Sequence, residues 1–211
     1  MQARFITLEG GEGVGKSTQA RLLTQALRDR GHEVLLTREP GGTSGAEAIR
    51  ALLLDPSGAG WGARAEALLF AAARADHVER AIAPALAAGQ WVVCDRFVES
   101  SRAYQGGEGT LTDADILDLH RIGSNGLLPN LTLLLEADPA VAARRLLARD
   151  GAASDRIAAR DATYHERVAR RFARMAQHEP ARFVRIGADG SPEDVHRAVL
   201  AAIDAHLEVQ K

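Results

Sequence analysis

The residues best suited to chemistry lie near the N-terminus, in the stretch Gly-Gly-Glu-Gly-Val-Gly-Lys-Ser at positions 10–17. The stretch matches the pattern G-x-x-x-x-G-K-[ST], and it stands between an apolar run, residues 5–8, and a segment with helical periodicity, residues 18–30. Glycines place no Cβ between the backbone amides and an anion, so successive N–H groups can surround a polyphosphate at the start of a helix. The residues predicted to bind it are Gly10, Gly11, Glu12, Gly13, Val14, Gly15, Lys16, Ser17 and Thr18.

Two side chains of this loop would act directly on the phosphates. Lys16 would contact the β- and γ-phosphates of a nucleotide such as ATP, and Ser17 would bind Mg²⁺. Of the 26 lysines and arginines in the chain, only Lys16 and Lys211 are lysines. A compact ammonium suits a tight phosphate loop better than a planar guanidinium does. The alternative interpretation is a flexible glycine-rich turn with an exposed lysine.

A second candidate site follows the apolar run at residues 91–94, where Asp95 is succeeded by Arg96. In a phosphate-loop fold this strand lies close to the loop, so the carboxylate of Asp95 can hold Mg²⁺ directly or through water. The guanidinium of Arg96, the next residue, can bind an anion beside this cation. The alternative role for Asp95 is a helix N-cap, a position that aspartate also favours.

A third group of charged residues surrounds the polar stretch 150–157. Its arginines are Arg144, Arg145, Arg149, Arg156 and Arg160. Such a run is usually a solvated helix face. The phosphate loop, however, has no basic residue except Lys16, so an arginine that neutralises a transferring phosphoryl group must come from elsewhere, and a mobile lid is a natural source. We therefore predict a short lid at about residues 149–157, with Arg149 and Arg156 as catalytic arginines beside Lys16 and Arg96.

Alternating strands and helices must position these residues. We expect strands at residues 4–9, 32–37, 90–94, 131–135 and 182–186, and helices at 18–30, 44–54, 63–88, 97–104, 112–125, 139–149, 158–178 and 192–207. Pro84 could kink the long helix or start a second one, and Ile49, Leu52 and Leu53 are expected to face inward. The alternation predicts an α/β fold with a five-stranded parallel sheet covered on both faces, formed by residues 1–211 as a single domain.

Composition excludes several classes of protein. The chain has 211 residues, of which 46% are hydrophobic and 26% charged, so it is too polar throughout for a membrane span. Its formal charge of −2 provides no general attraction for nucleic acid. The single cysteine, Cys94, cannot form an internal disulfide, and the N-terminus leads straight into a strand without a signal peptide. We expect a cytoplasmic protein.

The stretch Asp95-Arg96-Phe97-Val98-Glu99-Ser100-Ser101-Arg102-Ala103-Tyr104-Gln105 closely resembles the nucleoside monophosphate signature of thymidylate kinases, D-R-[FYH]-x-x-S-x-x-A-[YF]-Q. Further segments agree with that family in the same order, at residues 37–43, 49–54, 68–74 and 155–157. The resemblance extends from about Arg4 to Leu207. It implies the phosphate-loop nucleoside monophosphate kinase fold, a sheet order of 2-3-1-4-5, and a homodimer.

The resemblance also implies roles for the acceptor-site residues. Phe70 would stack on the thymine, Arg74 would hydrogen-bond the base, and Ser100 would help to orient it. Tyr104 would lie against the sugar and disfavour a 2′-hydroxyl, and Gln105 would contact the base or sugar. The residues that would face phosphate, sugar hydroxyl or metal are Arg50, Arg96, Asp95 and Glu12. Without the resemblance, Phe70 and Arg74 would be interpreted as a core residue and a surface residue one turn apart.

The reaction implied is transfer of the γ-phosphoryl group of Mg·ATP to dTMP, giving dTDP for dTTP synthesis. One alternative is a deoxynucleoside kinase such as a thymidine kinase, in which Glu39 could serve as the base. Another is a nucleotide-dependent switch that transfers nothing. The sequence departs from the family pattern at Glu108-Gly109-Thr110, Asn130, Glu136 and Ala158, changes that concern the lid and loops.

Overall fold

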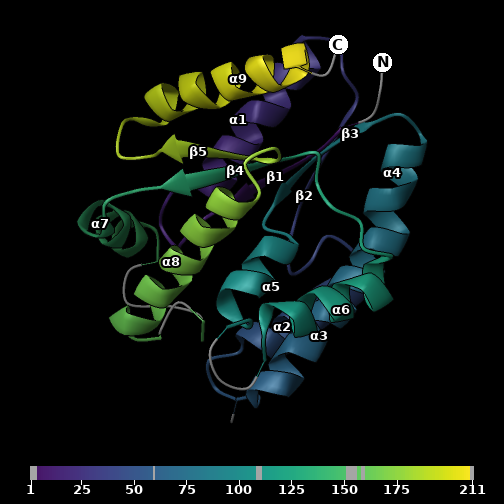
Figure 1. Cartoon of the computed structure of the whole chain (residues 1–211), viewed down its shortest axis with the longest axis vertical. Coiled ribbons are helices and arrows are strands. Elements are labelled where there is room, and N and C mark those ends of the chain that lie inside the picture. The colour runs from purple at the N-terminus through teal and green to yellow at the C-terminus, as the bar shows by residue number, and fades with distance from the viewer. Residues whose placement is uncertain (1–3, 59, 108–110, 151–155, 158–159, 210–211) are drawn as a thin grey trace.

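Five parallel strands form the central sheet of the computed structural model, which describes residues 4–58, 60–107, 111–150, 156–157 and 160–209, without the side chains of 149–150 and 207–209. The strands are β1 (Phe5–Glu9), β2 (Val34–Arg38), β3 (Trp91–Asp95), β4 (Leu131–Glu136) and β5 (Phe183–Gly187). They lie in the order β2-β3-β1-β4-β5, as Figure 1 shows. The five-stranded sheet and its predicted order are confirmed.

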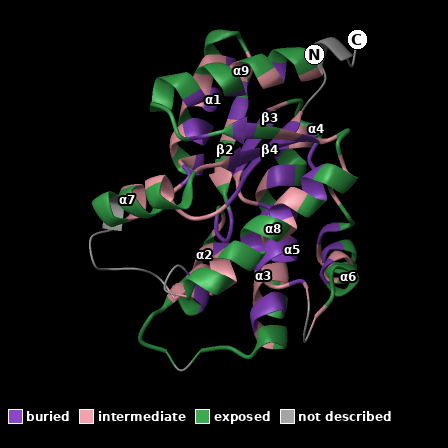
Figure 2. Cartoon of the chain, turned by 60° about the vertical axis from the view of Figure 1, so that its left-hand side comes forward, coloured by how far each residue is buried: buried purple, intermediate pink, exposed green. Residues whose placement is uncertain are grey.

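Helices cover both faces of the sheet, which explains why its strands are apolar almost throughout. Helices α1 (Lys16–Asp29) and α9 (Pro192–Val209) pack together on one face, over a core that includes Leu8, Leu23 and Leu133. Helices α5 (Val98–Tyr104) and α8 (Ala162–His178) pack together on the other face. The central strands β3, β1 and β4 are almost completely buried, whereas the edge strands β2 and β5 are partly exposed (Figure 2).

The remaining helices extend from the second face and from the sheet edge (Figure 1). They are α2 (Ser44–Leu54), α3 (Ala63–His77), α4 (Ala83–Ala87), α6 (Asp113–Ser124) and α7 (Pro139–Asp150). The stretch Val78–Ile82 is a π-helix, η1, between α3 and α4, so the predicted break near Pro84 occurs without a separate loop. Helix α8 was predicted from residue 158 but begins at Ala162, where Asp161 accepts a hydrogen bond from the Tyr164 amide and caps the helix.

The prediction that Leu52 faces inward is wrong, because this side chain is 54% exposed. Leu53 is buried as expected, and Ala46, two turns earlier, shares its face. Successive residues of a helix point about 100° apart, so two adjacent leucines cannot both face a narrow contact with one neighbouring helix. Leu68 on α3 is also exposed.

Among the described residues, no helix combines the length and the apolar composition that crossing a membrane requires.

Candidate active site

A cavity of about 680 Å³ opens where the loops after β1, β2 and β3 meet, at the carboxyl ends of the strands. Crevices at this edge of a parallel sheet are the usual ligand sites of such folds, and the volume suits a small molecule. The cavity brings together segments separated by more than 80 residues in the chain. The predicted site residues that line it are Glu12, Gly13, Val14, Gly15, Lys16, Ser17, Thr18, Arg50, Phe70, Arg74, Asp95, Arg96, Ser100, Tyr104 and Gln105.

The glycine-rich loop wraps the start of α1. Gly13 and Gly15 have positive φ angles of 74° and 97°, and Gly15 is the N-cap of the helix, which begins at Lys16. The Lys16 side chain is buried, and its Nζ donates a hydrogen bond to the Gly11 carbonyl oxygen at 2.5 Å. Burial, followed by the nearby charge of Arg96, lowers the pKa of Lys16 to about 8. The loop thus presents backbone amides and one weakly solvated ammonium to the cavity.

Gly13 should be one of the least replaceable residues of this loop. An alanine Cβ there would lie 2.3 Å from the Ala142 carbonyl oxygen, on a backbone whose φ of 74° already disfavours a side chain. We expect Gly13→Ala to lower the free energy of unfolding by about 3 kcal/mol, or the melting temperature by about 10 °C. Gly11→Ala is the matched control, since no atom lies within 4 Å of its added Cβ. Equal melting temperatures for the two ligand-free variants would contradict this.

Asp95 and Ser17 face each other across the base of the loop. The Ser17 hydroxyl donates to Asp95 Oδ2, while Asp95 Oδ1 is buried without a hydrogen-bond partner among the described residues. A buried carboxylate oxygen with no donor beside it fits a cation, and a hydroxyl and a carboxylate are the hard oxygen ligands that Mg²⁺ prefers. The described residues contain no cluster of three or more His, Cys, Asp or Glu side chains placed for a metal. A cation here would therefore need phosphate oxygens as further ligands.

Arg96 connects the glycine-rich loop to α5. Its backbone adopts a left-handed φ of 70°, a conformation that costs a residue with a side chain about 1 kcal/mol or more. Nη1 donates to the Gly10 carbonyl and the Ser100 hydroxyl, both at 3.0 Å, and Nη2 donates to Glu12 at 2.6 Å. The guanidinium also lies over the Tyr104 ring. A strained backbone that is held by this many contacts is typical of a functional position.

Arg74 is almost completely buried in the wall of the cavity. Its Nε donates to Glu39 at 2.7 Å, and Nη2 donates to the Ser101 hydroxyl and the Phe97 carbonyl. Nη1 forms no hydrogen bond with any described residue, so it can serve a ligand. Phe70 packs beside it at the edge of an apolar cluster that includes Tyr104 and Phe172. The arrangement places an aromatic ring and a directed N–H donor at one end of the cavity.

Glu39, considered above as a base, already has both carboxylate oxygens engaged. Oε2 accepts from Arg74, and Oε1 pairs with His77 Nδ1 at 3.1 Å, with all three side chains buried. His77 Nε2 in turn bonds the Thr37 hydroxyl at 2.7 Å. A carboxylate that holds an arginine in place is poorly suited to accept a substrate proton.

Three other predicted residues already bond protein groups near the cavity. Arg50 donates from Nη1 to the Pro40 carbonyl at 2.7 Å. Gln105 donates to Glu66, which also pairs with Arg160 at 2.5 Å. The Tyr104 hydroxyl donates to Glu12 at 3.2 Å. These three residues, which the resemblance places at the acceptor, are thus held in position by hydrogen bonds to protein groups around the cavity.

Of the two predicted lid arginines, Arg156 is the one whose side chain the structure describes. The side chain of Arg149 lies outside the described residues, as do Glu108, Gly109, Thr110 and Ala158, at which the sequence departs from the family pattern. Arg156 does not line the cavity, because its Nη2 donates to the Gly58 carbonyl at 2.7 Å. Its neighbour Ile157 does line the cavity.

Two parts of the site were missed by sequence reasoning. At the far end of the cavity, Gly190, Pro192 and Val195 form a wall with Arg145, whose guanidinium is held by the carbonyls of residues 188–190 at 2.6–3.1 Å. The basic run suggested Arg145 without a role, and no local pattern connects it with residues more than 40 positions later. Glu9, at the end of β1, was also missed because it reads as the last residue of an apolar strand. It is completely buried, and burial, followed by the Glu99 carboxylate, raises its pKa.

Comparisons with known proteins agree on one family. A family model described as thymidylate kinase matches residues 8–199. A thymidylate kinase of Rhizorhabdus wittichii is 66% identical over 145 residues, covering 69% of this chain and 70% of that protein, and one of Bradyrhizobium sp. is 50% identical over 151 residues, covering 72% and 67%. The crystal structure of thymidylate kinase from Ehrlichia chaffeensis superposes with a TM-score of 0.77 at 30% identity, over 97% of this chain and 99% of that one.

Proposed function

The chain belongs to the thymidylate kinase family, and from this we propose how its cavity transfers a phosphoryl group from Mg·ATP to dTMP. As an enzyme of this family it phosphorylates dTMP to dTDP. The observation that carries the proposal is the presence of two cationic groups in one cavity, Lys16 at the end of the glycine-rich loop and Arg96 between β3 and α5. Each would bind one of the two phosphate-bearing substrates.

Positioning and neutralisation of charge would supply the catalysis. A phosphate monoester has a second pKa near roughly 6, so the acceptor is already a nucleophilic anion at neutral pH and needs no general base. Bringing two polyanions together is then the main barrier. Lys16 and the loop amides would hold the β- and γ-phosphates, and Arg96 with Arg50 would hold the acceptor phosphate. This accounts for a site in which Glu39, the carboxylate considered as a base, is occupied by Arg74 and His77.

We propose that Ser17 and Asp95 hold Mg²⁺ together with oxygens of the nucleotide. Oδ1 of Asp95, which has no hydrogen-bond partner in the part of the chain that the structure describes, supports this placement. The cation would neutralise negative charge on the transferring phosphate. The adenine of ATP would lie at the far end of the cavity, on the Arg145 guanidinium beside Pro192 and Val195, because a fixed planar cation and apolar side chains form a stacking surface for a base.

At the acceptor end, Phe70 would stack on thymine while Nη1 of Arg74 donates to the base. Ser100 and Gln105 would border the base, and Tyr104 would lie against the sugar with its hydroxyl on Glu12. We propose Arg149 and Arg156 as arginines of a lid that covers the donor phosphates. To take this position, Arg156 would have to break its hydrogen bond to the Gly58 carbonyl. Lid closure would also exclude water and so limit hydrolysis of ATP.

The test is ADP release from Mg·ATP by the full chain, with each nucleoside monophosphate and thymidine added separately. We expect dTMP to raise the rate at least about 100-fold over thymidine, because a neutral nucleoside leaves the Arg96 site without an anion. A preference for thymidine would make the protein a deoxynucleoside kinase. Slow hydrolysis that no acceptor stimulates would identify a switch. The dUMP rate measures how far the thymine methyl group matters.

We further propose a cytoplasmic homodimer. The single cysteine, Cys94, is free and buried, as suits a reducing compartment. Leu52 on α2 and Leu68 on α3 are exposed apolar side chains on helices that pack against each other, and Ile122 on α6 is 71% exposed. These side chains are candidate contacts with a second copy. Sedimentation equilibrium of the protein and of Leu68→Glu would test the assignment.

A further inference from the structure

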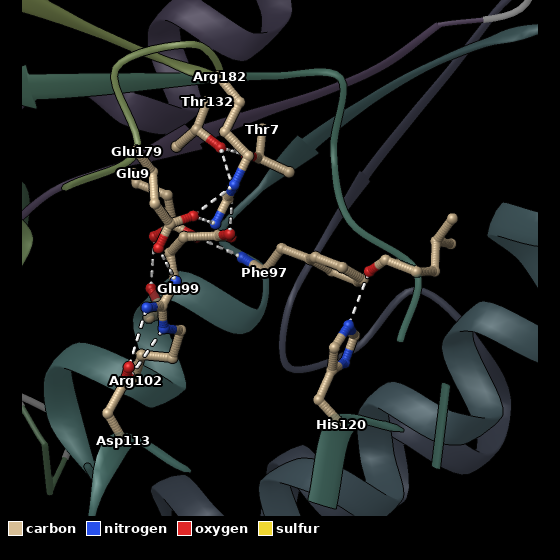
Figure 3. A network of polar contacts seen from close by, with 12 residues as sticks. Thr7, Glu9, Phe97, Glu99, Arg102, Asp113, His120, Thr132, Glu179 and Arg182 are labelled. Atoms are coloured by element: carbon tan, nitrogen blue, oxygen red, sulfur yellow. Dashed lines mark hydrogen bonds and ion pairs between the residues drawn. The ribbon is translucent and has the colours of Figure 1, made fainter. Parts of the chain in front are cut away.

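Beneath the catalytic arginine lies a buried carboxylate that the reaction described above does not use. Glu9 is the last residue of β1 and is completely buried. It shares one face of the sheet with Thr7, since side chains alternate along a strand. Figure 3 shows Glu9 and Glu99 close together, with a contact from Glu9 to the backbone nitrogen of Phe97. Glu99 has its own partner, Arg182, at 2.6 Å.

Both oxygens of Glu9 accept hydrogen bonds from the segment that carries Arg96. Oε1 accepts from the Phe97 amide and Oε2 from the Ser100 hydroxyl, each at 2.7 Å. A serine hydroxyl has a single proton, so donating it to Glu9 leaves only the oxygen lone pairs for other partners. Arg96 Nη1 donates to that oxygen at 3.0 Å. Glu9 therefore determines the orientation of the Ser100 hydroxyl, and the oxygen of this hydroxyl accepts the hydrogen bond from the Arg96 guanidinium.

The same carboxylate holds the backbone turn on which Arg96 stands. Arg96 has the left-handed φ of 70°, and its own amide donates to the Leu8 carbonyl, next to Glu9. The Phe97 amide, one residue further on, is bound by Glu9 Oε1. A strained conformation persists only where its surroundings hold it from several sides. Glu9 supplies one of these contacts from below, while the Gly10 carbonyl and Glu12 bind the guanidinium from the glycine-rich loop.

We propose that Glu9 is a positioning residue for phosphoryl transfer: through Ser100 and the Phe97 amide it sets the placement of the Arg96 guanidinium. This inference rests on the proposed role of Arg96 at the acceptor phosphate. Glu9 touches neither substrate. A small displacement of a group that stabilises the transition state lowers the rate while leaving the binding of the other substrate intact.

Glu9→Gln tests this. Glutamine keeps the volume of glutamate, but an N–H₂ group replaces one of the two oxygens. Either the Phe97 amide or the Ser100 hydroxyl then faces a donor in place of its acceptor. We expect kcat with dTMP to fall about 10-fold, with the KM for ATP unchanged. The ratio of the dTMP and dUMP rates should also stay constant, since both acceptors present the same phosphate to Arg96. Thr7→Val is the matched control, because Thr7 lies on the same strand and face as Glu9. The change removes a buried hydrogen bond to Thr132 on β4, and it should leave kcat within about twofold.

A double-mutant cycle identifies the route of the effect. In an Arg96→Ala background, Glu9→Gln should have no further effect on kcat, because the group it positions is gone. An equal loss in both backgrounds, an equal loss in Thr7→Val, or an unchanged Glu9→Gln would each overturn the proposal. Should Glu9→Gln fail to fold, Glu9→Asp tests the same relay, because it keeps the carboxylate but shortens its reach, and it is expected to slow dTMP and dUMP alike. A change in the preference for one base would then contradict the relay.

The wild-type measurement separates this inference from the function on which it depends. If the unmodified chain shows no ADP release that depends on dTMP, the proposed function fails. If it is active and Glu9→Gln matches it in kcat, only the positioning role fails. Melting temperatures of Glu9→Gln and Thr7→Val, measured without ligand, show whether a loss of activity accompanies a loss of folding.

Discussion

Lys16→Ala is expected to lower kcat/KM for ATP by about 1,000-fold, the largest effect of any single change in this chain. The ammonium is buried in the loop, where no solvent can replace it, and removing one preorganised group that stabilises transition-state charge costs about 100- to 1,000-fold. ADP release at varied ATP with saturating dTMP measures the loss. A circular dichroism spectrum like that of the wild type would show that the fold remains.

Lys16→Arg is the control for charge alone. Its guanidinium is planar and larger, whereas Lys16 Nζ sits 2.5 Å from the Gly11 carbonyl oxygen in a closed loop. We therefore expect no recovery of activity. Activity close to that of the wild type would show that any cation suffices at this position and would contradict the role given to the loop geometry.

The same residue predicts how the rate depends on pH. Since burial lowers the pKa of Lys16 to about 8 in the free protein, its ammonium is lost as the pH rises through that value. The ratio kcat/KM for ATP follows ionisation in the free enzyme, so it should fall about 10-fold per pH unit above pH 8. Bound phosphates favour the charged form, so kcat alone should fall only at higher pH. An alkaline fall at the same pH in Lys16→Arg would assign it to another group.

Arg96→Ala is expected to reduce kcat/KM for dTMP by about 100- to 1,000-fold, because the acceptor phosphate and the developing charge lose a partly buried cation that is held by Gly10, Ser100 and Glu12. Arg185→Ala is the matched control. Arg185 is 54% exposed and pairs with Glu136 at the surface, where such a bridge contributes little. The control should retain activity within about twofold. Initial rates at varied dTMP, with ATP saturating, measure both variants.

Arg96→Gly separates the cost of the backbone from the benefit of the side chain. Glycine adopts a φ of 70° without strain, so this variant should be more stable than Arg96→Ala by about 1 kcal/mol and equally inactive. Chemical denaturation of the two variants tests the difference. A glycine variant less stable than the alanine variant would mean that the left-handed turn carries no strain.

Local patterns in the sequence were sufficient for most of the architecture. Apolar runs of four to six residues, each followed by a turn and a periodic segment, are properties of neighbouring residues, so they predicted the five strands and placed the glycine-rich loop between β1 and α1. The positions of Lys16 and Ser17 follow from the loop pattern alone. The residues from Asp95 to Gln105 were assigned to the acceptor site because their spacing repeats a family signature.

Only the tertiary structure determined the burial and the hydrogen bonds that depend on which helices and strands pack together. Leu52 and Leu53 are equally apolar, and only the packing of α2 on α3 turns one of them outward. The sequence around Glu39 indicates no partner for its carboxylate. In the structure both oxygens are bound, one by Arg74 and one by His77, which lie 35 and 38 residues away in the chain. Glu9 lies 88 residues from Phe97 and 91 from Ser100. Hydrogen bonding and burial depend on distance in space, and no local pattern encodes contacts between residues so far apart in the chain.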